Sequence, residues 1–182
     1  MKHLYILFTF ITSVSFAQLT PPPELQSYYT DVDFSLSGNS LYTDLATETI
    51  AAHSPFLTYS QRHDYLYDAD EDLSNTSNVV LIYSGESRNE NEYLSGSNPY
   101  PTQTFNTEHV YPRSLLDNSN AEADLHLLRT CDINVNSNRG NDPFIAGSGT
   151  YSSTGSAWYP GDDWRGDVAR IVLYVNLRYN ES

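Results

Sequence analysis

Two adjacent residues, Glu108 and His109, have side chains that could take part in one reaction. A carboxylate oxygen can hold a hard cation such as Mg²⁺, and an imidazole can take a proton from water. Successive side chains of a flat strand point to opposite faces, whereas a twisted or bulged strand can direct both toward one site. The pair therefore predicts metal-assisted hydrolysis, provided that further ligands and cations lie nearby.

A run of amide side chains follows further along the chain, at Asn134, Asn136, Asn138 and Asn141. Amide oxygens suit Mg²⁺, which usually takes only one or two protein oxygens and completes its octahedron with water and phosphate. One glutamate and one asparagine would therefore suffice as protein ligands. The run could equally form a turn-rich loop, because asparagine bonds its own backbone and tolerates left-handed conformations.

Arginines near these residues could contact phosphate groups. All six basic residues after position 104 are arginines, whose planar guanidinium groups suit bidentate phosphate contacts. The chain as a whole has a net charge of −14, which argues against tight binding of a polyanion. Residues 1–104 carry −10 of that charge and residues 105–182 carry −4. The negative charge that would repel nucleic acid is therefore smaller in the part of the chain that contains the motifs. We expect few phosphate contacts and rapid release of the product.

Three motifs together resemble the bacterial endonuclease I family, which contains periplasmic or secreted non-specific nucleases of the His-Me finger (ββα-metal) class. They are Glu-His-Val-x-Pro at 108–112, Asp-Leu-His-x-Leu at 124–128 and Val-Asn-x-x-Arg-x-Asn at 135–141. Weaker similarity extends to residues 57–59, 82–84 and 165–170.

The resemblance implies a role for each residue that matches the motifs. His109 would be the general base, and Glu108 and Asn136 would be the protein ligands of one Mg²⁺. In such sites a backbone carbonyl orients the imidazole through its second nitrogen, and here that carbonyl would lie near Glu122 or Ala123. The chain lacks the long cysteine-bearing insertion of proteobacterial members, so an arginine from that insertion has no counterpart here.

In place of that arginine we assign contact with the phosphate or the transition state to Arg113 and Arg139. His126 lies two residues from Asp124 among leucines, which favours a hydrogen-bonded histidine that supports the site. Cys131 is the only cysteine, so no disulfide can form within the chain, and we expect a buried structural thiol.

The predicted fold is α+β, with mixed helices and short strands around a ββα-metal finger. We expect a helix at 42–52, a buried strand at 78–83 and a long loop at 85–104. Residues 136–141 should start or flank the helix of the finger, and another helix should begin near Asp167.

Residues 1–17 have a basic start, a short apolar region and a small-residue cleavage site, as in a secretory signal peptide. Residues 18–182 are then expected to form one nuclease domain that is secreted or periplasmic, with no membrane span. The final apolar run ends close to Ser182, whereas the resemblance implies further residues, so we expect truncation of the domain at its C-terminus.

The sequence thus predicts a monomeric, Mg²⁺-dependent, non-specific endonuclease that leaves 5′-phosphate products. DNA is the expected substrate, with RNA as an open alternative. A different class of function remains, a secreted non-catalytic module that binds glycan or protein through an acidic surface rich in Tyr and Asn. A metallopeptidase is disfavoured because the chain has no His-Glu-x-x-His pair.

Overall fold

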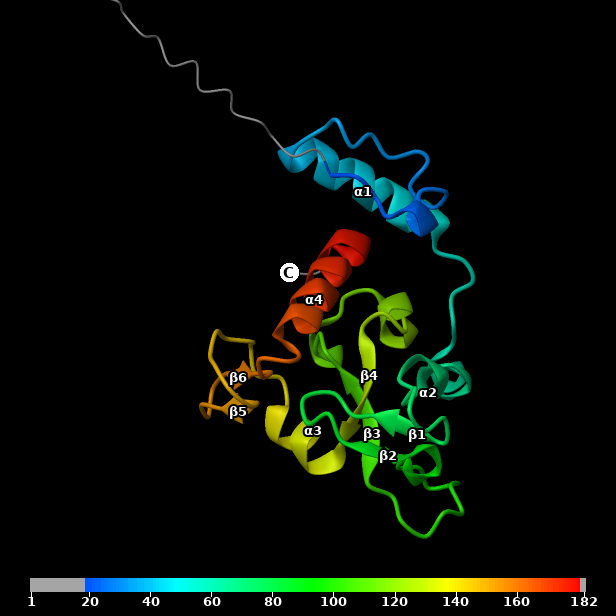
Figure 1. The fold of residues 1–182 in the computed structure, drawn as a ribbon, viewed down its shortest axis with the longest axis vertical. Coiled ribbons are helices and arrows are strands. Elements are labelled where there is room, and N and C mark those ends of the chain that lie inside the picture. The colour runs from blue at the N-terminus through cyan, green and yellow to red at the C-terminus, as the bar shows by residue number, and fades with distance from the viewer. Residues whose placement is uncertain (1–18, 181–182) are drawn as a thin grey trace, which may run out of the picture. The chain divides into compact units, whose positions relative to one another are not determined.

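The computed structural model describes residues 19–180, and it divides the chain into two compact units before and after Thr49 (Figure 1). The predicted signal peptide at residues 1–17 lies outside the described residues. In chain order the elements are η1 Pro23–Leu25, α1 Gly38–Ala52, η2 Tyr59–Asp64, α2 Leu66–Ala69, β1 Asn78–Val80, β2 Ser87–Asn89, η3 Glu90–Glu92, β3 Phe105–His109, η4 Arg113–Leu115, η5 Ser119–Ala123, β4 Leu128–Asp132, α3 Ile133–Arg139, β5 Ser152–Ser153, β6 Trp158–Tyr159 and α4 Arg165–Tyr179.

The first unit contains η1 and most of α1. The helix predicted at 42–52 is present and begins four residues earlier, at Gly38. Within this unit the Asp44 carboxylate accepts a hydrogen bond of 2.7 Å from the backbone N–H of Asp33, which connects the helix to the loop before it.

The second unit contains three two-stranded antiparallel sheets among its described residues. The α+β class is therefore confirmed. The strand predicted at 78–83 is shorter than expected, because only Asn78–Val80 pairs with β2. The chain then turns at Tyr83 and Gly85, which have φ angles of 70° and 68°. The turn carries Tyr83 out of the sheet and into the interior.

β3 and β4 form the longest of these ladders, and α3 follows β4 directly (Figure 1). Glu108 is paired with Arg129 and His109 with Leu128, and no bulge interrupts the five consecutive pairs. α3 begins at Ile133, three residues before the predicted start. Asn136 therefore lies within the helix.

The main hydrophobic core of the second unit joins β4 to α4. Val168, Ile171 and Val175 are buried at spacings of three and four residues, which places them on one face of α4. Burial of each such side chain stabilises the fold by about 1.5–3 kcal/mol. Asp167 lies in the first turn of α4, where its charge is favourable, so the predicted helix start is confirmed. Cys131 is buried in the same core, as expected.

Among the described residues, no helix combines the length and the apolar character that a membrane crossing requires.

Candidate active site

A cavity of about 150 Å³ lies between the end of β3 and α3. It brings together the five residues to which a catalytic or metal-binding role was assigned, namely Glu108, His109, Arg113, Asn136 and Arg139. Its lining residues are Thr107, Glu108, His109, Pro112, Arg113, Asn136, Arg139, Gly140 and Asn141. Glu108 and His109 both line this cavity although they are consecutive residues of a ladder without a bulge.

Glu108 is a buried carboxylate with two polar neighbours. Its Oε1 accepts a hydrogen bond of 2.8 Å from the Tyr83 hydroxyl and lies 3.4 Å from Nε of Arg139. Burial raises the pKa of Glu108 to about 7, although the charge of Arg139 and the hydrogen bond from Tyr83 oppose that rise. Both of these side-chain contacts involve Oε1, and a hydrogen bond from the backbone N–H of His109 to the carboxylate also opposes the rise in its pKa.

Arg139 is buried as well, with only 1% of its surface exposed. Its two terminal nitrogens donate to the backbone carbonyls of Gly140, at 2.8 Å, and Val110, at 2.6 Å. A buried charge is costly without a partner, and Glu108 is that partner. In this arrangement the guanidinium group holds Glu108 and the backbone, while its contact with phosphate stays a prediction.

His109 is oriented by a backbone carbonyl. Its Nε2 lies 3.0 Å from the carbonyl oxygen of Glu122, as the resemblance implied. Because a carbonyl oxygen only accepts, Nε2 carries the proton and Nδ1 is the basic nitrogen of the neutral ring. Burial lowers the pKa of His109 to about 4, and the positive charges of Arg113 and Arg62 add to this shift. The ring is therefore neutral at pH 7.

Tyr59 forms an aromatic platform beside His109. The two ring centroids lie 5.7 Å apart in a stacked arrangement. The guanidinium groups of Arg62 and Arg113 lie 3.5 Å and 4.8 Å from the centroid of the Tyr59 ring. Arg62 also donates a hydrogen bond of 3.3 Å to Oγ1 of Thr107, which lines the cavity.

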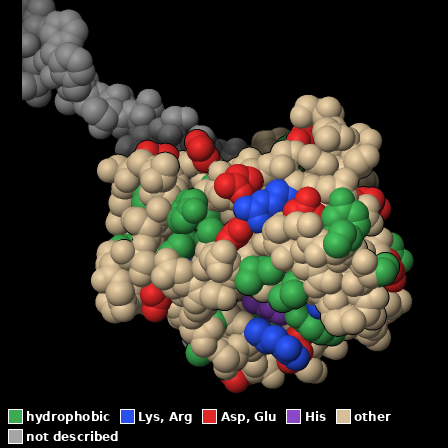
Figure 2. Space-filling model, turned by 90° about the horizontal axis from the view of Figure 1, so that it is seen from below, with side chains coloured by type: hydrophobic (Ala, Val, Ile, Leu, Met, Phe, Trp, Pro, Cys, Tyr) green, Lys and Arg blue, Asp and Glu red, His purple; other side chains and the backbone are tan. Residues whose placement is uncertain are grey.

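Arg113 is the more accessible of these two cations. Its Nε and one terminal nitrogen donate to one carboxylate oxygen of Glu122, at 3.0 Å and 2.7 Å, and about half of its side chain is exposed. On the face drawn in Figure 2, the Lys and Arg side chains form separate patches with acidic and hydrophobic side chains between them. The basic side chains therefore form no continuous track on this face.

Asn136 turns its amide nitrogen toward β3. Nδ2 donates to Oδ1 of Asn106, at 2.8 Å, and to the carbonyl oxygen of Thr107, at 3.2 Å. These two acceptors use both N–H groups, so Oδ1 is the atom that can face a cation. Asn138 is exposed and does not line the cavity, whereas Asn141 does. The geometry thus leaves two candidate amides, Asn136 and Asn141.

His126 lies outside this cavity and contacts the buried Asp124. Nδ1 of His126 lies 2.9 Å from Oδ1 of the buried Asp124, and the ring stacks on Tyr174 of α4. The other oxygen of Asp124 accepts hydrogen bonds of 2.8 Å from the hydroxyls of Tyr174 and Tyr179. This network connects α4 to the segment that carries the Glu122 carbonyl.

Sequence reasoning missed Tyr83, Tyr59 and Arg62 as members of the site. Tyr83 and Tyr59 fall within the short segments of weak similarity, which was the only signal for them. No group of three or more His, Cys, Asp or Glu side chains in the described part of the chain could hold a metal. Any metal here would therefore depend on a sparse set of carboxylate and amide oxygens.

Comparison with known proteins agrees with the motifs. The profile of the Endonuclease I family matches residues 37–182. The extracellular ribonuclease of Bacillus subtilis (strain 168) is 36% identical over 172 residues, which are 90% of this chain and 57% of that protein. The extracellular ribonuclease of Bacillus amyloliquefaciens is 34% identical over 180 residues, which are 94% of this chain and 60% of that protein.

The chain therefore spans less than two thirds of the length of these relatives. No solved structure gives a significant match. Since the family profile covers most of the sequence, including every residue of the cavity, this chain belongs to the endonuclease I family.

Proposed function

We propose that this chain is a secreted, metal-dependent nuclease that hydrolyses phosphodiester bonds without sequence specificity and leaves 5′-phosphate ends. The observation that carries the proposal is the single cavity in which the neutral imidazole of His109 lies beside Glu108 and Asn136. Family membership supports the reaction type, and the extracellular ribonuclease relatives support both secretion and RNA as the first substrate to test. DNA is the second substrate to test.

The donor atoms of the cavity fit Mg²⁺. The carboxylate of Glu108 and the amide oxygen of Asn136 are hard ligands, and Mg²⁺ usually needs only one or two from the protein. Burial penalises the ionised form of Glu108, so a divalent cation would stabilise that form. The chemistry that a bound Mg²⁺ supplies is neutralisation of the charge that develops on the phosphate oxygens and on the leaving group. We further propose that β3, β4 and α3 form the ββα-metal finger.

His109 would act as the general base at Nδ1. The hydrogen bond from Nε2–H to the Glu122 carbonyl holds the ring in the required tautomer, and stacking on Tyr59 restrains its plane. Water that loses a proton to Nδ1 attacks phosphorus, and the bond to the 3′-oxygen breaks. A positioned base contributes about 10²–10⁴-fold to such a rate.

The arginines have different proposed roles. Arg113 is half exposed at the edge of the cavity, so it can contact a phosphate oxygen when its bonds to Glu122 are exchanged. Arg139 would have to give up two backbone carbonyls to do the same. We therefore assign Arg139 to holding Glu108 and Arg113 to the phosphate.

The test is incubation of the purified chain with single-stranded RNA and with plasmid DNA in Mg²⁺, in EDTA, and in EDTA followed by excess Mg²⁺. We expect cleavage in the first and third conditions, and products that a 5′-phosphate-dependent exonuclease degrades. A folded chain that cleaves neither substrate in Mg²⁺ would overturn the proposal and leave the non-catalytic binding module in its place. Equal cleavage in EDTA and in Mg²⁺ would show that the reaction needs no metal and would remove the metal from the proposal.

A further inference from the structure

Arg62 is a half-buried cation that has no acidic partner within ion-pair distance among the described residues. Most of the other described arginines do have one, namely Arg88, Arg113, Arg129, Arg139, Arg165 and Arg170. Arg62 instead donates from Nε to Oγ1 of Thr107, at 3.3 Å, and from one terminal nitrogen to the carbonyl oxygen of Tyr59. A guanidinium group has five N–H donors, so Arg62 keeps donors for a ligand.

The position of this charge is unfavourable without an anion. Burial is the main cause that lowers the pKa of Arg62, and the charge of Arg113 acts in the same direction. The guanidinium group nevertheless stays protonated at pH 7. The ring of Tyr59, whose centroid lies 3.5 Å from the guanidinium carbon, stabilises the cation less than a full negative charge would. A bound anion would offset the remaining cost of burial.

A second cation adjoins the same ring. The guanidinium carbon of Arg113 lies 4.8 Å from the centroid of Tyr59, and Glu122 pairs with Arg113 but not with Arg62. An excess of positive charge therefore lies beside His109, whose pKa both arginines lower after the larger effect of burial. Acidic groups elsewhere on the chain do not cancel this excess, because charges more than about 8 Å apart on the surface are largely screened at physiological ionic strength.

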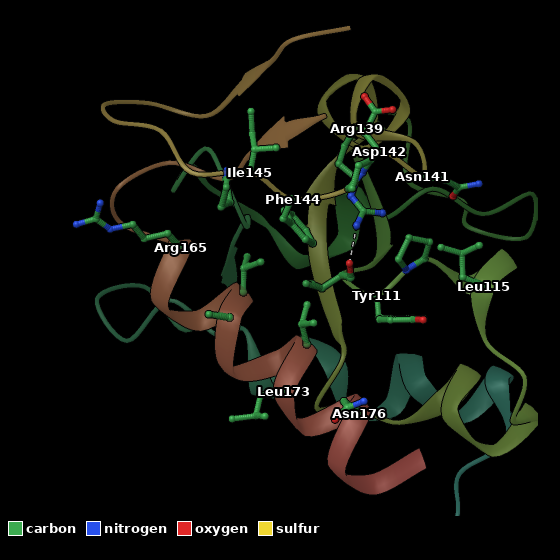
Figure 3. A pocket seen from close by; sticks show the side chains of 17 residues that line it. Tyr111, Leu115, Arg139, Asn141, Asp142, Phe144, Ile145, Arg165, Leu173 and Asn176 are labelled. Carbon is green, nitrogen blue, oxygen red and sulfur yellow. Dashed lines mark hydrogen bonds between the residues drawn. The ribbon is translucent and has the colours of Figure 1, made fainter. Parts of the chain in front are cut away.

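Arg62 lies one side chain beyond the wall of the candidate active site. Thr107 accepts its hydrogen bond and lines the small cavity, whereas Arg62 lines neither that cavity nor the larger hollow of about 860 Å³ drawn in Figure 3. Arg139, in contrast, lines both hollows and donates to the Val110 carbonyl. With the scissile phosphate in the small cavity, the phosphate that Arg62 can reach is the next one along the strand.

We propose that Arg62 binds the phosphate next to the scissile one, and that cleavage is efficient only where this second phosphate is present. The inference rests on the proposed nuclease function and adds a substrate-binding residue to it. Arg113 contacts the scissile phosphate in that proposal, so the two cations beside Tyr59 would hold successive phosphates of one strand. Such contacts position the strand and carry no sequence information, which agrees with cleavage without sequence specificity.

Binding in EDTA tests the contact without cleavage. The probe is a fluorescein-labelled uridine hexamer, titrated at several KCl concentrations. Arg62→Gln should reduce the slope of log K against log salt by about one unit, because one phosphate contact is lost. Arg62→Lys keeps the charge and should keep the parent slope. The matched control is Arg170→Gln, since Arg170 is exposed on α4 and pairs with Asp167.

Circular dichroism confirms that each variant is folded. A slope in Arg62→Gln that equals the parent slope would overturn the proposal. Equal losses of slope in Arg62→Gln and Arg62→Lys would also overturn it, because the side chain would then act only through its packing on Tyr59 and its bond to Thr107.

Uridine dinucleotides identify the bound phosphate. The plain dinucleotide has only the scissile phosphate, and its 5′- and 3′-phosphorylated forms add a neighbour on one side or the other. In Mg²⁺ the parent should cleave one phosphorylated form with a kcat/KM about tenfold above that of the plain form. Arg62→Gln should bring this ratio close to one, whereas Arg113→Gln should lower both rates and keep the ratio.

A ratio close to one in the parent, or an unchanged ratio in Arg62→Gln, would overturn the proposal. So would a parent that cleaves the hexamer but none of the three dinucleotides, because one neighbouring phosphate would then be insufficient. A ratio that collapses in Arg113→Gln but not in Arg62→Gln would transfer the second phosphate to Arg113.

The two experiments separate this inference from the proposed function. If the salt slope falls as expected in Arg62→Gln but no chain cleaves RNA or DNA in Mg²⁺, the phosphate contact stands and the catalytic proposal is wrong. If the parent cleaves the hexamer only in Mg²⁺ and neither the slope nor the ratio depends on Arg62, the nuclease proposal stands and this inference is wrong.

Discussion

The hydroxyl of Tyr83 lies 2.8 Å from Oε1 of Glu108, and both side chains are buried. The phenol reaches this position because the backbone of Tyr83 has a positive φ of 70° and leaves the path of β1. Oε1 of Glu108 thus contacts both a neutral donor, Tyr83, and a charged one, Arg139. This geometry makes Tyr83 a positioning residue for the proposed metal ligand.

Tyr83→Phe should raise the Mg²⁺ concentration needed for half-maximal activity by about tenfold, because outer partners of a ligand usually change metal affinity by 10–100-fold. At saturating Mg²⁺ the variant should recover most of its kcat. Titration of Mg²⁺ in an RNA cleavage assay measures the effect. Tyr100→Phe is the control, since Tyr100 is exposed in the loop before β3. An unchanged requirement in Tyr83→Phe would show that the hydrogen bond is only structural.

His109→Ala should lower turnover by at least about 10²-fold, as is usual for loss of a general base, and should leave binding of RNA in EDTA nearly unchanged. His126→Ala is the matched control, because His126 also bonds a polar group but is 68% exposed outside the cavity. It should retain activity within a fewfold of the parent. Equal turnover by His109→Ala and the parent would remove His109 from the mechanism.

Asn136→Ala should increase the Mg²⁺ requirement, and Asn138→Ala should leave it unchanged, because Asn136 lines the cavity and Asn138 does not. Glu108→Gln should increase it further, since a charged ligand becomes neutral while its size is kept. Asn141→Ala completes the series because Asn141 also lines the cavity. A metal defect in Asn141→Ala without one in Asn136→Ala would transfer the ligand role to Asn141.

Binding to RNA should depend only weakly on salt. The separate patches of basic side chains in Figure 2 and the exposed Arg113 predict a slope of log K against log salt that corresponds to about two to four neutralised phosphates. Arg113→Gln should reduce that slope by about one unit. Arg170→Gln is the control on α4, where the exposed Arg170 pairs with Asp167. A slope near −8 in the parent would indicate a far larger basic track.

Asp124→Asn should destabilise the fold by about 2 kcal/mol at pH 7, because hydrogen bonds to a buried charge are lost. Burial alone would raise the pKa of Asp124, but hydrogen bonds from His126, Tyr174 and Tyr179 outweigh it and hold the pKa below its usual value of 3.8. The stabilisation is therefore fully present above about pH 4 and is lost as the pH falls through the folded-state pKa. Urea unfolding of parent and variant at pH 7 and pH 2.5 measures it, and a constant difference at both values would contradict the assignment.

The local parts of the site could be predicted from the sequence. The Glu108–His109 pair and most of the amide run lie within short motifs, and the Glu122 carbonyl lies two residues before another motif. Such motifs place reactive groups on neighbouring residues, so they can be recognised without knowledge of the fold. The position of Asn136 in the cavity follows from the same local pattern, although the helix begins three residues before the predicted start.

The environment of Arg139 could not be predicted in the same way. An arginine in a polar run is typical of an exposed phosphate contact, and nothing in the local sequence indicates Glu108 as its partner. Its burial depends on Glu108 and on the carbonyl of Val110, which are 31 and 29 residues away along the chain. Tyr83 is 25 residues from Glu108, so its hydrogen bond is equally a product of the tertiary fold. The hydrogen bonds and ion pairs around a site come from residues that are far apart in the sequence, even where the reactive groups themselves are adjacent.

Asp132 accepts hydrogen bonds from the backbone N–H groups of Asn134 and Val135, and Arg88 holds its other oxygen at 2.8 Å. An α-helix has 3.6 residues per turn, so a start that moved by one residue would rotate every later side chain by about 100°. Asn136 would then leave the cavity although its sequence was unchanged. The cap at Asp132 therefore sets the rotational phase of α3, and through it the direction in which the amide of Asn136 points.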